Sequence, residues 1–233
     1  MSSYFLRLLD EICKLLETYK GRDKVLRTLC YTTKLIGGLH GNKALADKFL
    51  LFSKHMSGTR ATLRLLDDLP MLKYNLEYGF GKEEPDKLMA ALGVTTNVID
   101  QVYYPVEKIA WLAEHKLITG VDNNKWDTIS SIFWVSSIYL TLMRSLRFVS
   151  ILQKHRYCGA VKNDESVSLE KLLLRRNYEV VTCVRLCLDF VHAVNTLPKG
   201  FLWSSKLNTW QVGLIATTSS VLGIYQIYAK RDL

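Results

Sequence analysis

The side chains of this 233-residue chain that could do metal chemistry are scattered along the sequence. It contains five histidines, and no two of them have the H-E-x-x-H or H-x-x-x-H spacing that places two imidazoles on one helix face. Two acidic pairs, Asp67-Asp68 and Glu83-Glu84, consist of adjacent residues. Adjacent side chains point in different directions on a helix, so they make a poor metal site. We interpret both pairs as parts of solvated faces.

Motifs for phosphate binding and for nucleophilic catalysis are also missing. The stretch "YGFGKEE" has Gly79 and Gly81, but it lacks the third glycine and the preceding strand of a nucleotide-binding loop. No G-x-S-x-G sequence is present. The five cysteines are odd in number and form no C-x-x-C pair, which favours a reducing compartment over a disulfide framework or a zinc site. We therefore expect a protein that is not an enzyme and has no cofactor or metal.

The composition indicates a chain that lies partly in a membrane. Hydrophobic residues make up 48% and charged residues 23%, with a mean hydropathy of +0.05 and a net charge of +9. Residues 128–206 carry 11 lysines and arginines against 5 acidic residues, whereas residues 1–127 are close to balance. A basic excess suits anionic lipid or nucleic acid. Because no nucleic-acid-binding motif accompanies it, we expect no nucleic-acid partner.

Helical periodicity is typical of the first 120 residues, which we predict to be a region of amphipathic helices. Apolar residues at spacings of three and four predict a first helix that ends at Lys20-Gly21. A second helix is expected from about residue 23 to residue 36, before Gly37-Gly38. A further helix is expected over about 86–115, with a kink at Pro105 because proline lacks the donor for an intrahelical hydrogen bond.

The clearest pattern is an unbroken heptad seam over residues 45–66. Its apolar members are Leu45, Phe49, Phe52, Met56, Leu63 and Leu66. The seam could pack on neighbouring helices, or it could insert into the lipid interface. Four basic residues off the seam are the candidates for headgroup contacts, namely Lys48, Lys54, Arg60 and Arg64. We expect this helix to kink or end near Pro70, because proline disfavours a helical conformation in the residue before it.

Two uncharged runs in the C-terminal half are candidates for membrane helices. Residues 128–143 contain no charge, and we place the first membrane helix at 126–147 although this run is near the lower length limit for crossing. Residues 207–229 form the second uncharged run, which is long enough to cross but holds several polar residues. A stripe of small residues in it lets helices approach closely in a membrane, namely Gly213, Ala216, Ser220 and Gly223.

The basic segment 148–206 separates these two runs. We expect a loop over about residues 144–164 and an amphipathic helix that starts after Ser168. Its stretch 180–197 could dip into the membrane or dock on the surface. The predicted fold is therefore all-α, with amphipathic helices in an N-terminal half followed by two membrane-embedded helices. If the stretch 180–197 enters the membrane, it is a third such helix. If both uncharged runs were core helices, the chain would instead be a soluble helical adaptor.

Four motifs follow one another along residues 15–228 in a recognisable order. The first, "YKGRDKVLRTLCYTTKL", carries a signature made of Gly21, Arg22, Asp23, Lys24 and Arg27. "TRATLRLLDDLPML" has an arginine-rich helix followed by an acidic pair. "DQVYYPVEKIAWLAEHKLI" contributes Tyr103, Tyr104, Pro105, Glu107 and Trp111. With the final motif, "LPKGFLWSSKLNTWQVGLIATTSSVLGIYQ", the chain resembles the peroxin-11 family of peroxisomal membrane proteins, most closely its gamma type.

This resemblance implies a function in membrane remodelling. Members elongate the peroxisomal membrane before fission, by amphipathic-helix insertion and self-association. The partners implied are peroxisomal membrane lipids, further copies of this chain, the alpha and beta members of the family, tail-anchored fission adaptors and a dynamin-related GTPase. The alternative is a peroxisomal membrane channel for small metabolites, which needs polar residues along a path between helices. Arg185 and Asp189 are the candidates for that path.

The resemblance also implies that both termini lie in the cytosol. The basic segment 148–206 would then face the lumen, whereas the positive-inside rule predicts the reverse. That rule describes insertion by the translocon. The N-terminal stretch is interrupted by Arg7, Asp10 and Glu11, so it lacks the continuous apolar region of a secretory signal. We therefore follow the resemblance.

Membrane residence is tested by alkaline carbonate extraction of peroxisomes, followed by protease protection with tags at both termini. We expect the protein to stay in the membrane pellet and both tags to be digested, because two crossings place both termini on one side. Release into the supernatant would contradict the membrane interpretation and return residues 207–229 to a soluble core.

Overall fold

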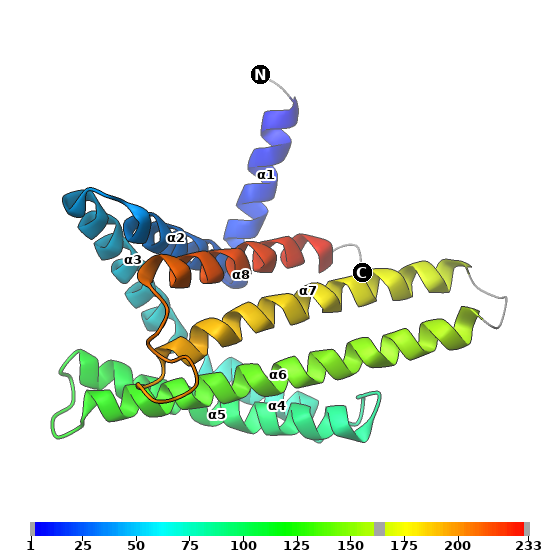
Figure 1. Cartoon of the computed structure of the whole chain (residues 1–233). Coiled ribbons are helices and arrows are strands. Elements are labelled where there is room, and N and C mark those ends of the chain that lie inside the picture. Colours follow the sequence, from blue (N-terminus) through cyan, green and yellow to red (C-terminus); the bar gives the residue numbers. More distant parts are fainter. Residues whose placement is uncertain (1–2, 161–165, 231–233) are drawn as a thin grey trace. The chain divides into compact units, whose positions relative to one another are not determined.

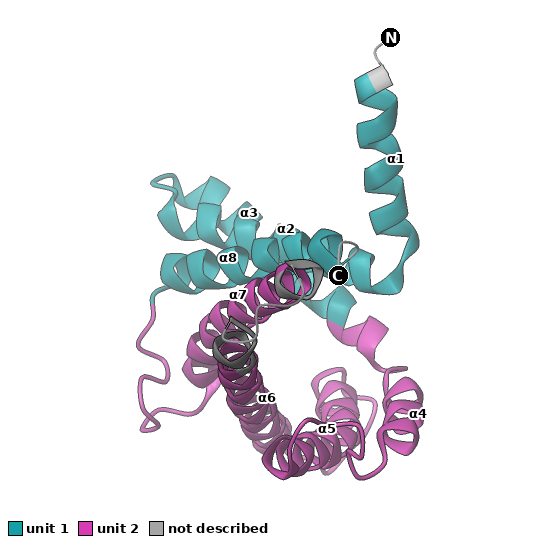
Figure 2. Cartoon of the chain, turned by 90° about the vertical axis from the view of Figure 1, so that its right-hand side faces the viewer, with its two compact units in different colours: residues 1–60, 208–232 teal, residues 61–207, 233 magenta. Residues whose placement is uncertain are grey.

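The computed structural model describes residues 3–160 and 166–230, and this part of the chain consists of eight helices without a strand (Figure 1). The prediction of an all-α fold with two candidate membrane helices in the C-terminal half is confirmed. The chain divides into two compact units, coloured teal and magenta in Figure 2. Unit 1 contains residues 1–60 and 208–232, and unit 2 contains residues 61–207. Residues 1–60 of the predicted segment 1–120 therefore share a unit with the C-terminal segment, whereas residues 61–120 belong to unit 2.

Unit 1 is built from α1 (Ser3–Glu17), α2 (Tyr19–Leu39), α8 (Thr209–Ala229) and most of α3 (Lys43–Arg64). The expected ends of the second helix were wrong. The break between α1 and α2 lies at Thr18, whose hydroxyl accepts a hydrogen bond from the Gly21 N–H at 3.0 Å and caps α2. At its other end, α2 continues through Gly37-Gly38 to Leu39.

The glycines inside α2 and α8 lie where the two helix backbones meet. A Cβ atom on Gly38 would be 2.6 Å from the backbone nitrogen of Trp210 in α8. A Cβ atom on Gly213 would be 2.5 Å from the backbone nitrogen of Leu35 in α2. No side chain fits in either place, so the close approach explains why residues of low helix propensity lie inside both helices.

Unit 2 contains α4 (Asp68–Tyr78), α5 (Lys87–Glu114), α6 (Asn123–Ala160) and α7 (Ser166–Thr196). In Figure 1, α5, α6 and α7 run side by side, and α6 packs on both of the others. An apolar core joins α6 to α7 through Ile138, Leu142, Cys183, Leu186 and Ala193. The prediction of a loop from residue 144 was wrong, because α6 continues to Ala160. Residues 161–165 of that expected loop lie outside the described residues.

The helix that carries the heptad seam ends earlier than expected. It stops at Arg64, whereas the sequence predicted an end or a kink near Pro70. Pro70 instead lies in the first turn of α4, where its missing N–H would have no intrahelical acceptor in any case. Pro105 lies inside α5, whose bounds agree with the expected helix within a few residues.

Two helices are long and apolar enough to cross a membrane, over Asn123–Lys154 of α6 and Thr209–Ala229 of α8. In α8, the polar residues Ser219, Ser220 and Gln226 are buried, whereas Leu214, Val221 and Tyr225 are exposed. These three polar side chains thus lie on the packing face of α8, and the three apolar ones are available to lipid. The hydroxyl of exposed Thr218 donates to the Leu214 carbonyl oxygen of the same helix at 2.9 Å. This arrangement accounts for the mediocre apolar content of residues 207–229.

The contact between α2 and α8 is tested by Gly213→Ala. The added methyl group would overlap the α2 backbone, and we expect a loss of about 1–3 kcal/mol of stability, measured as a lower thermal midpoint in detergent. Gly58→Ala is the matched control, because a Cβ atom there meets nothing within 4 Å. That change should keep or raise the midpoint, since alanine favours a helix by about 1 kcal/mol. Equal effects of the two changes would contradict the close approach.

Candidate functional site

The predicted insertion face on α3 is largely exposed in the structure. Leu45, Phe52, Leu63 and Leu66 are exposed, and Phe49 and Met56 are half-buried. Leu66 lies just beyond the end of α3. The residues of α3 that are buried are Ala46 and Ser53, each one position away from the seam. The Cys30 thiol of α2 donates a hydrogen bond to the Ser53 carbonyl oxygen at 3.3 Å, so α3 contacts α2 through this other face.

The four predicted headgroup residues fall into two groups. Lys48 and Lys54 are exposed on α3. Arg60 binds Asp23 of α2, with 2.8 Å between Nε and Oδ1. Arg64 binds Glu107 of α5, with 2.6 Å between Nη2 and Oε1. A headgroup role therefore remains a prediction best suited to the two lysines, because each arginine already binds a carboxylate.

These ion pairs bring motifs together that lie far apart in the sequence. Arg60–Asp23 joins the second motif to the first, and Arg64–Glu107 joins it to the third. The Tyr103 hydroxyl donates a hydrogen bond to Glu107 Oε1 at 2.8 Å, which leaves that carboxylate shared by two helices. Burial raises the pKa of Tyr103 above its ordinary value of 10.0, so the phenol stays a donor.

The other signature residues have structural contacts. Gly21 lies in the first turn of α2 against the Leu15 carbonyl group. The Arg22 Nε–H donates a hydrogen bond to the Leu16 carbonyl oxygen at 2.5 Å. Lys24 is half-buried, and its carbonyl oxygen accepts the Thr28 hydroxyl. Buried Arg27 lies over the Tyr31 ring. In α5, Tyr104 packs edge-on against Tyr103, and Trp111 stacks on His115.

The stripe of small residues lies inside unit 1. Gly213, Ala216, Ser220 and Gly223 are all buried in α8. The Ser220 hydroxyl donates a hydrogen bond to the Ala216 carbonyl oxygen at 2.6 Å, so its donor is satisfied within α8 and needs no partner on another helix. The stripe therefore presents little more than backbone to the neighbouring helix, which is what a close approach requires.

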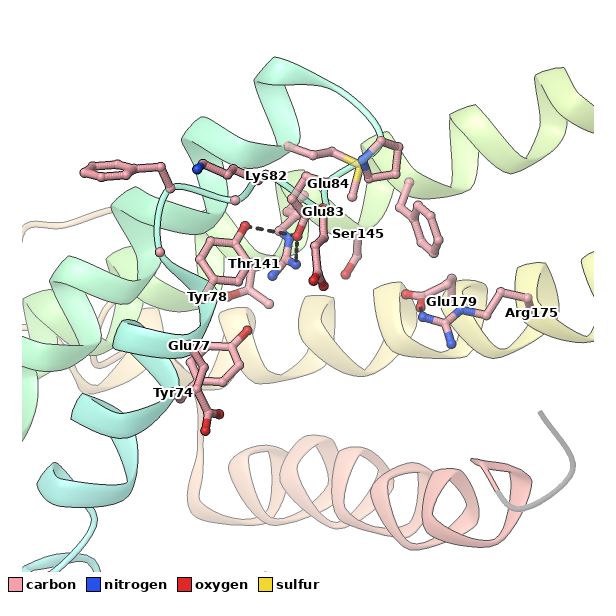
Figure 3. Close-up of a pocket in the computed structure, with 17 residues that line it drawn as sticks. Tyr74, Glu77, Tyr78, Lys82, Glu83, Glu84, Thr141, Ser145, Arg175 and Glu179 are labelled. Carbon is pink, nitrogen blue, oxygen red and sulfur yellow. Dashed lines mark hydrogen bonds and ion pairs between the residues drawn. The ribbon is translucent and has the colours of Figure 1, made fainter.

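Sequence reasoning missed a pocket of about 910 Å³ in unit 2. It is lined by α4, by residues 79–85 of the loop that joins α4 to α5, by Met89 of α5, and by α6 and α7. Figure 3 shows Tyr74, Glu77 and Tyr78 at one side of the view, Arg175 and Glu179 at the other, and Ser145 between them. Its signal in the sequence was the acidic loop "GKEEPD" together with the two arginines that follow the uncharged run 128–143.

Ion pairs attach this loop to α6. Glu84 pairs with Arg144, whose guanidinium carbon lies 5.6 Å from the centroid of the Tyr78 ring. The Tyr78 hydroxyl donates a hydrogen bond to Glu84 Oε1 at 3.0 Å. Burial, with a smaller contribution from this hydrogen bond, raises the pKa of Tyr78 to about 12. Asp86 binds Arg147 at 2.6 Å.

The interpretation of both acidic pairs as solvated faces was therefore wrong for one member of each. Glu84 binds Arg144, and Asp68 binds Lys108 with 2.6 Å between Oδ2 and Nζ. Of the other two members, Glu83 is exposed and Asp67 is half-buried. Within the described parts of the chain, no group of three histidine, cysteine, aspartate or glutamate side chains could hold a metal ion.

The family model described as Peroxisomal biogenesis factor 11 (PEX11) matches residues 9–228. The chain belongs to this family. Peroxisomal membrane protein 11C of Homo sapiens is 32% identical over 229 residues, which cover 94% of this chain and 93% of that protein. Peroxisomal membrane protein 11C of Mus musculus is 34% identical over 227 residues, covering 94% of both chains. No solved structure matches.

A more distant relative belongs to another type of the family. Peroxisomal membrane protein 11A of Homo sapiens is 24% identical over 165 residues, covering 70% of this chain and 67% of that protein. The two 11C proteins are the gamma type of the family. The predicted membership of the family and the resemblance to its gamma type are thus confirmed. The names of these relatives describe peroxisomal membrane proteins, and the two candidate spans of this chain fit membrane association.

Asp86 provides a test of how the loop between α4 and α5 is held in place. Its carboxylate caps α5 by accepting a hydrogen bond from the Met89 N–H at 2.8 Å. This hydrogen bond, and next the one from Arg147, hold its pKa below the ordinary value of 3.8. A lowered pKa stabilises the folded state above pH 3.8, and the contribution is lost as pH falls through the lower, folded-state pKa.

We expect the thermal midpoint in detergent to fall on acidification below about pH 4, and to fall less in Asp86→Asn, because asparagine cannot titrate there. At neutral pH, Asp86→Asn should be milder than Asp86→Ala, since asparagine still caps a helix. If both variants lose the same stability, the cap contributes nothing.

Proposed function

We propose that the protein promotes elongation and remodelling of the peroxisomal membrane and thereby fission of peroxisomes, by insertion of an amphipathic helix and by oligomerisation. The observation that carries this proposal is the exposed apolar seam of α3 in a member of this family. A helix that contacts its neighbour through Ala46 and Ser53 leaves the large apolar residues Leu45 and Phe52 exposed. Large exposed apolar faces are typical of interaction sites with membranes or with other proteins.

Insertion of such a helix has a mechanical consequence for the bilayer. The 22 residues of α3 make a rod about 33 Å long that could lie in the plane of the interface. An amphipathic helix buried about 5–10 Å into one leaflet expands that leaflet relative to the other, which favours curvature. Lys48 and Lys54, near the apolar seam, would contact anionic headgroups.

Oligomerisation would repeat this insertion at many points of one membrane. The helix α1 provides a second exposed apolar surface, with Phe5, Leu8 and Ile12 among its exposed residues. We assign self-association, and association with the alpha and beta members of the family, to surfaces of this kind. Tail-anchored fission adaptors and the dynamin-related GTPase are the further partners that family membership suggests.

Crossing of the peroxisomal membrane by α6 and α8 would anchor the chain. Two crossings put both termini on one side, in agreement with the expectation of two cytosolic termini. This arrangement requires that α7, which packs on the uncharged run of α6, does not make a third crossing. In this arrangement α3 lies on the same side as the N-terminus, because no candidate span separates them in the described residues. The inserted face would then act on the cytosolic leaflet.

A metabolite channel is the second candidate, and buried charges on α7 are the observation in its favour. Asp189 is 5% exposed, and Glu179 and His192 are also buried. Arg185 and Asp189 lie 3.5 Å apart between Nη1 and Oδ2, so they neutralise each other on the helix. A conducting path would require this pair to separate. Passage of a small dye through reconstituted liposomes measures this activity independently of membrane shape.

Phe52→Gln tests the insertion face in liposomes that contain anionic lipid, with electron microscopy as the readout. We expect the wild-type protein to form tubules and the variant to form several-fold fewer, because the inserted face loses an aromatic side chain. Leu29→Gln is the matched control, since Leu29 on α2 is 45% exposed and Phe52 is 43% exposed. Equal tubulation by wild type and Phe52→Gln would contradict insertion through this face.

Replacing Lys48 and Lys54 together by glutamine tests the headgroup contacts. At about 1 kcal/mol for each basic residue near an anionic surface, we expect roughly thirtyfold weaker binding to anionic vesicles. The difference should shrink as salt is raised, because salt screens exposed charges. Lys73→Gln, on α4, is the control and should bind as the wild type does. A salt-independent loss of binding would contradict the electrostatic assignment.

A further inference from the structure

The pocket in unit 2 carries charges of both signs at its surface. Its cationic residues are Lys82, Arg144 and Arg175, and its carboxylates are Glu77, Glu83, Glu84 and Glu179. Aromatic rings of Tyr74, Tyr78 and Phe148 lie among them. A ligand with a single charge would meet repulsion from part of this lining. A ligand that carries an anion and a cation, joined by a short linker, matches it.

The anionic part of such a ligand has donors available at the α7 side of the pocket. The Arg175 guanidinium lies 3.4 Å from Glu179 and 5.5 Å from the centroid of the Phe148 ring, and its side chain is 47% exposed. A guanidinium has five N–H donors, so one carboxylate leaves several of them for a further oxygen ligand. Arg144 adds a second guanidinium to the same pocket.

The cationic part has acceptors at the α4 side. Tyr74 stacks on Tyr78 with 5.8 Å between the ring centroids, and it is 45% exposed. Glu77, one turn along α4 from Tyr74, has a side chain that is 65% exposed, and its Oε1 atom lies 3.7 Å from Lys73 Nζ in an exposed ion pair that a ligand cation could replace. An aromatic face next to a carboxylate binds ammonium groups, and quaternary ammonium above all, because the ring face and the carboxylate are both negative.

The position of the pocket along α6 indicates where the ligand comes from. The uncharged run of α6 ends at Met143, and the pocket is lined on this helix by Thr141, Arg144, Ser145 and Phe148. A run of 16 residues is about 24 Å long, about 6 Å less than the thickness of a hydrocarbon core of about 30 Å. If this run lies in hydrocarbon, the pocket lies at the depth of the phosphate groups of one leaflet.

We propose that this pocket binds the headgroup of a zwitterionic phospholipid of the phosphocholine type. The phosphate diester accepts hydrogen bonds from Arg175 and Arg144, and the quaternary ammonium contacts Tyr74 and Glu77. The acyl chains lie along the apolar run of α6. The assignment requires that α6 crosses a membrane, and it is independent of whether the protein elongates that membrane.

The first experiment measures binding of glycerophosphocholine to the full chain in maltoside micelles by calorimetry. We expect saturable binding, about tenfold weaker in Arg175→Gln and in Glu77→Gln and unchanged in Arg176→Gln. Arg176 is the matched control because it neighbours Arg175 in the chain but does not line the pocket. Circular dichroism spectra and thermal midpoints identify any variant that has not folded.

Ligands that carry one charge test the need for both. Inorganic phosphate alone and choline alone should each bind at least tenfold more weakly than glycerophosphocholine. Phosphate that binds as tightly as glycerophosphocholine would overturn the assignment, since the pocket would then be an anion site. An absence of saturable glycerophosphocholine binding, or an equal loss in Arg176→Gln, would overturn it as well.

Nanodiscs separate a lipid headgroup from a soluble phosphodiester. In phosphatidylglycerol discs, added glycerophosphocholine should bind as it does in micelles. In phosphatidylcholine discs it should bind at least tenfold more weakly, because the surrounding lipid occupies the pocket. Equal binding in both discs would overturn the lipid assignment in favour of a soluble ligand. Tubulation assays in the same variants report separately on the proposed elongation function.

Discussion

The close contact between the backbones of α2 and α8 is the constraint on which unit 1 depends. It joins a segment near the N-terminus to the segment of residues 207–229, so unit 1 cannot form until nearly the whole chain exists. It also decides the orientation of α8 about its own axis. With Gly213 against Leu35, the polar residues Ser219, Ser220 and Gln226 are buried, and the apolar residues Leu214, Val221 and Tyr225 are exposed. A helix oriented in this way can lie in lipid in spite of its polar content.

Ion pairs between helices are the second organising interaction. Arg60–Asp23 in unit 1, and Arg64–Glu107 and Lys108–Asp68 in unit 2, join residues at least 37 positions apart in the sequence. Such pairs contribute little when they are exposed to water. Arg60 and Asp23 are mostly buried, and a buried charge that loses its partner is strongly unfavourable. This explains why charged residues recur in the motifs of this chain.

The same reasoning relates the pocket to the proposed function. Arg144 and Arg147 lie where the uncharged run of α6 ends, and their partners Glu84 and Asp86 belong to the loop between α4 and α5. The ion pairs therefore hold this loop at the end of the candidate span, where a membrane surface would be. In the two proposals above, α3 inserts into a leaflet and the pocket binds single lipid molecules in it.

The all-helical fold, the family and the two candidate spans were predictable, because they follow from local periodicity, from the length of uncharged runs and from ordered motifs. Helix ends were less predictable. Gly37-Gly38 resembled a helix end, and only the approach of α8 explains why α2 continues through it. The extent of α6 beyond Arg144 could not be predicted for a similar reason. This part of α6 has few apolar residues, and packing of α7 along the helix stabilises it.

The candidate site shows the same limit. The sequence by itself determined which residues of α3 share a face, since that depends only on the helical repeat. It did not determine that Arg60 and Arg64 bind acids, that one member of each acidic pair meets a basic residue, or that a pocket exists. These features depend on side chains distant in sequence, whose charges meet only when the helices pack. Local geometry is encoded along the chain, whereas complementarity between helices is decided by the tertiary structure.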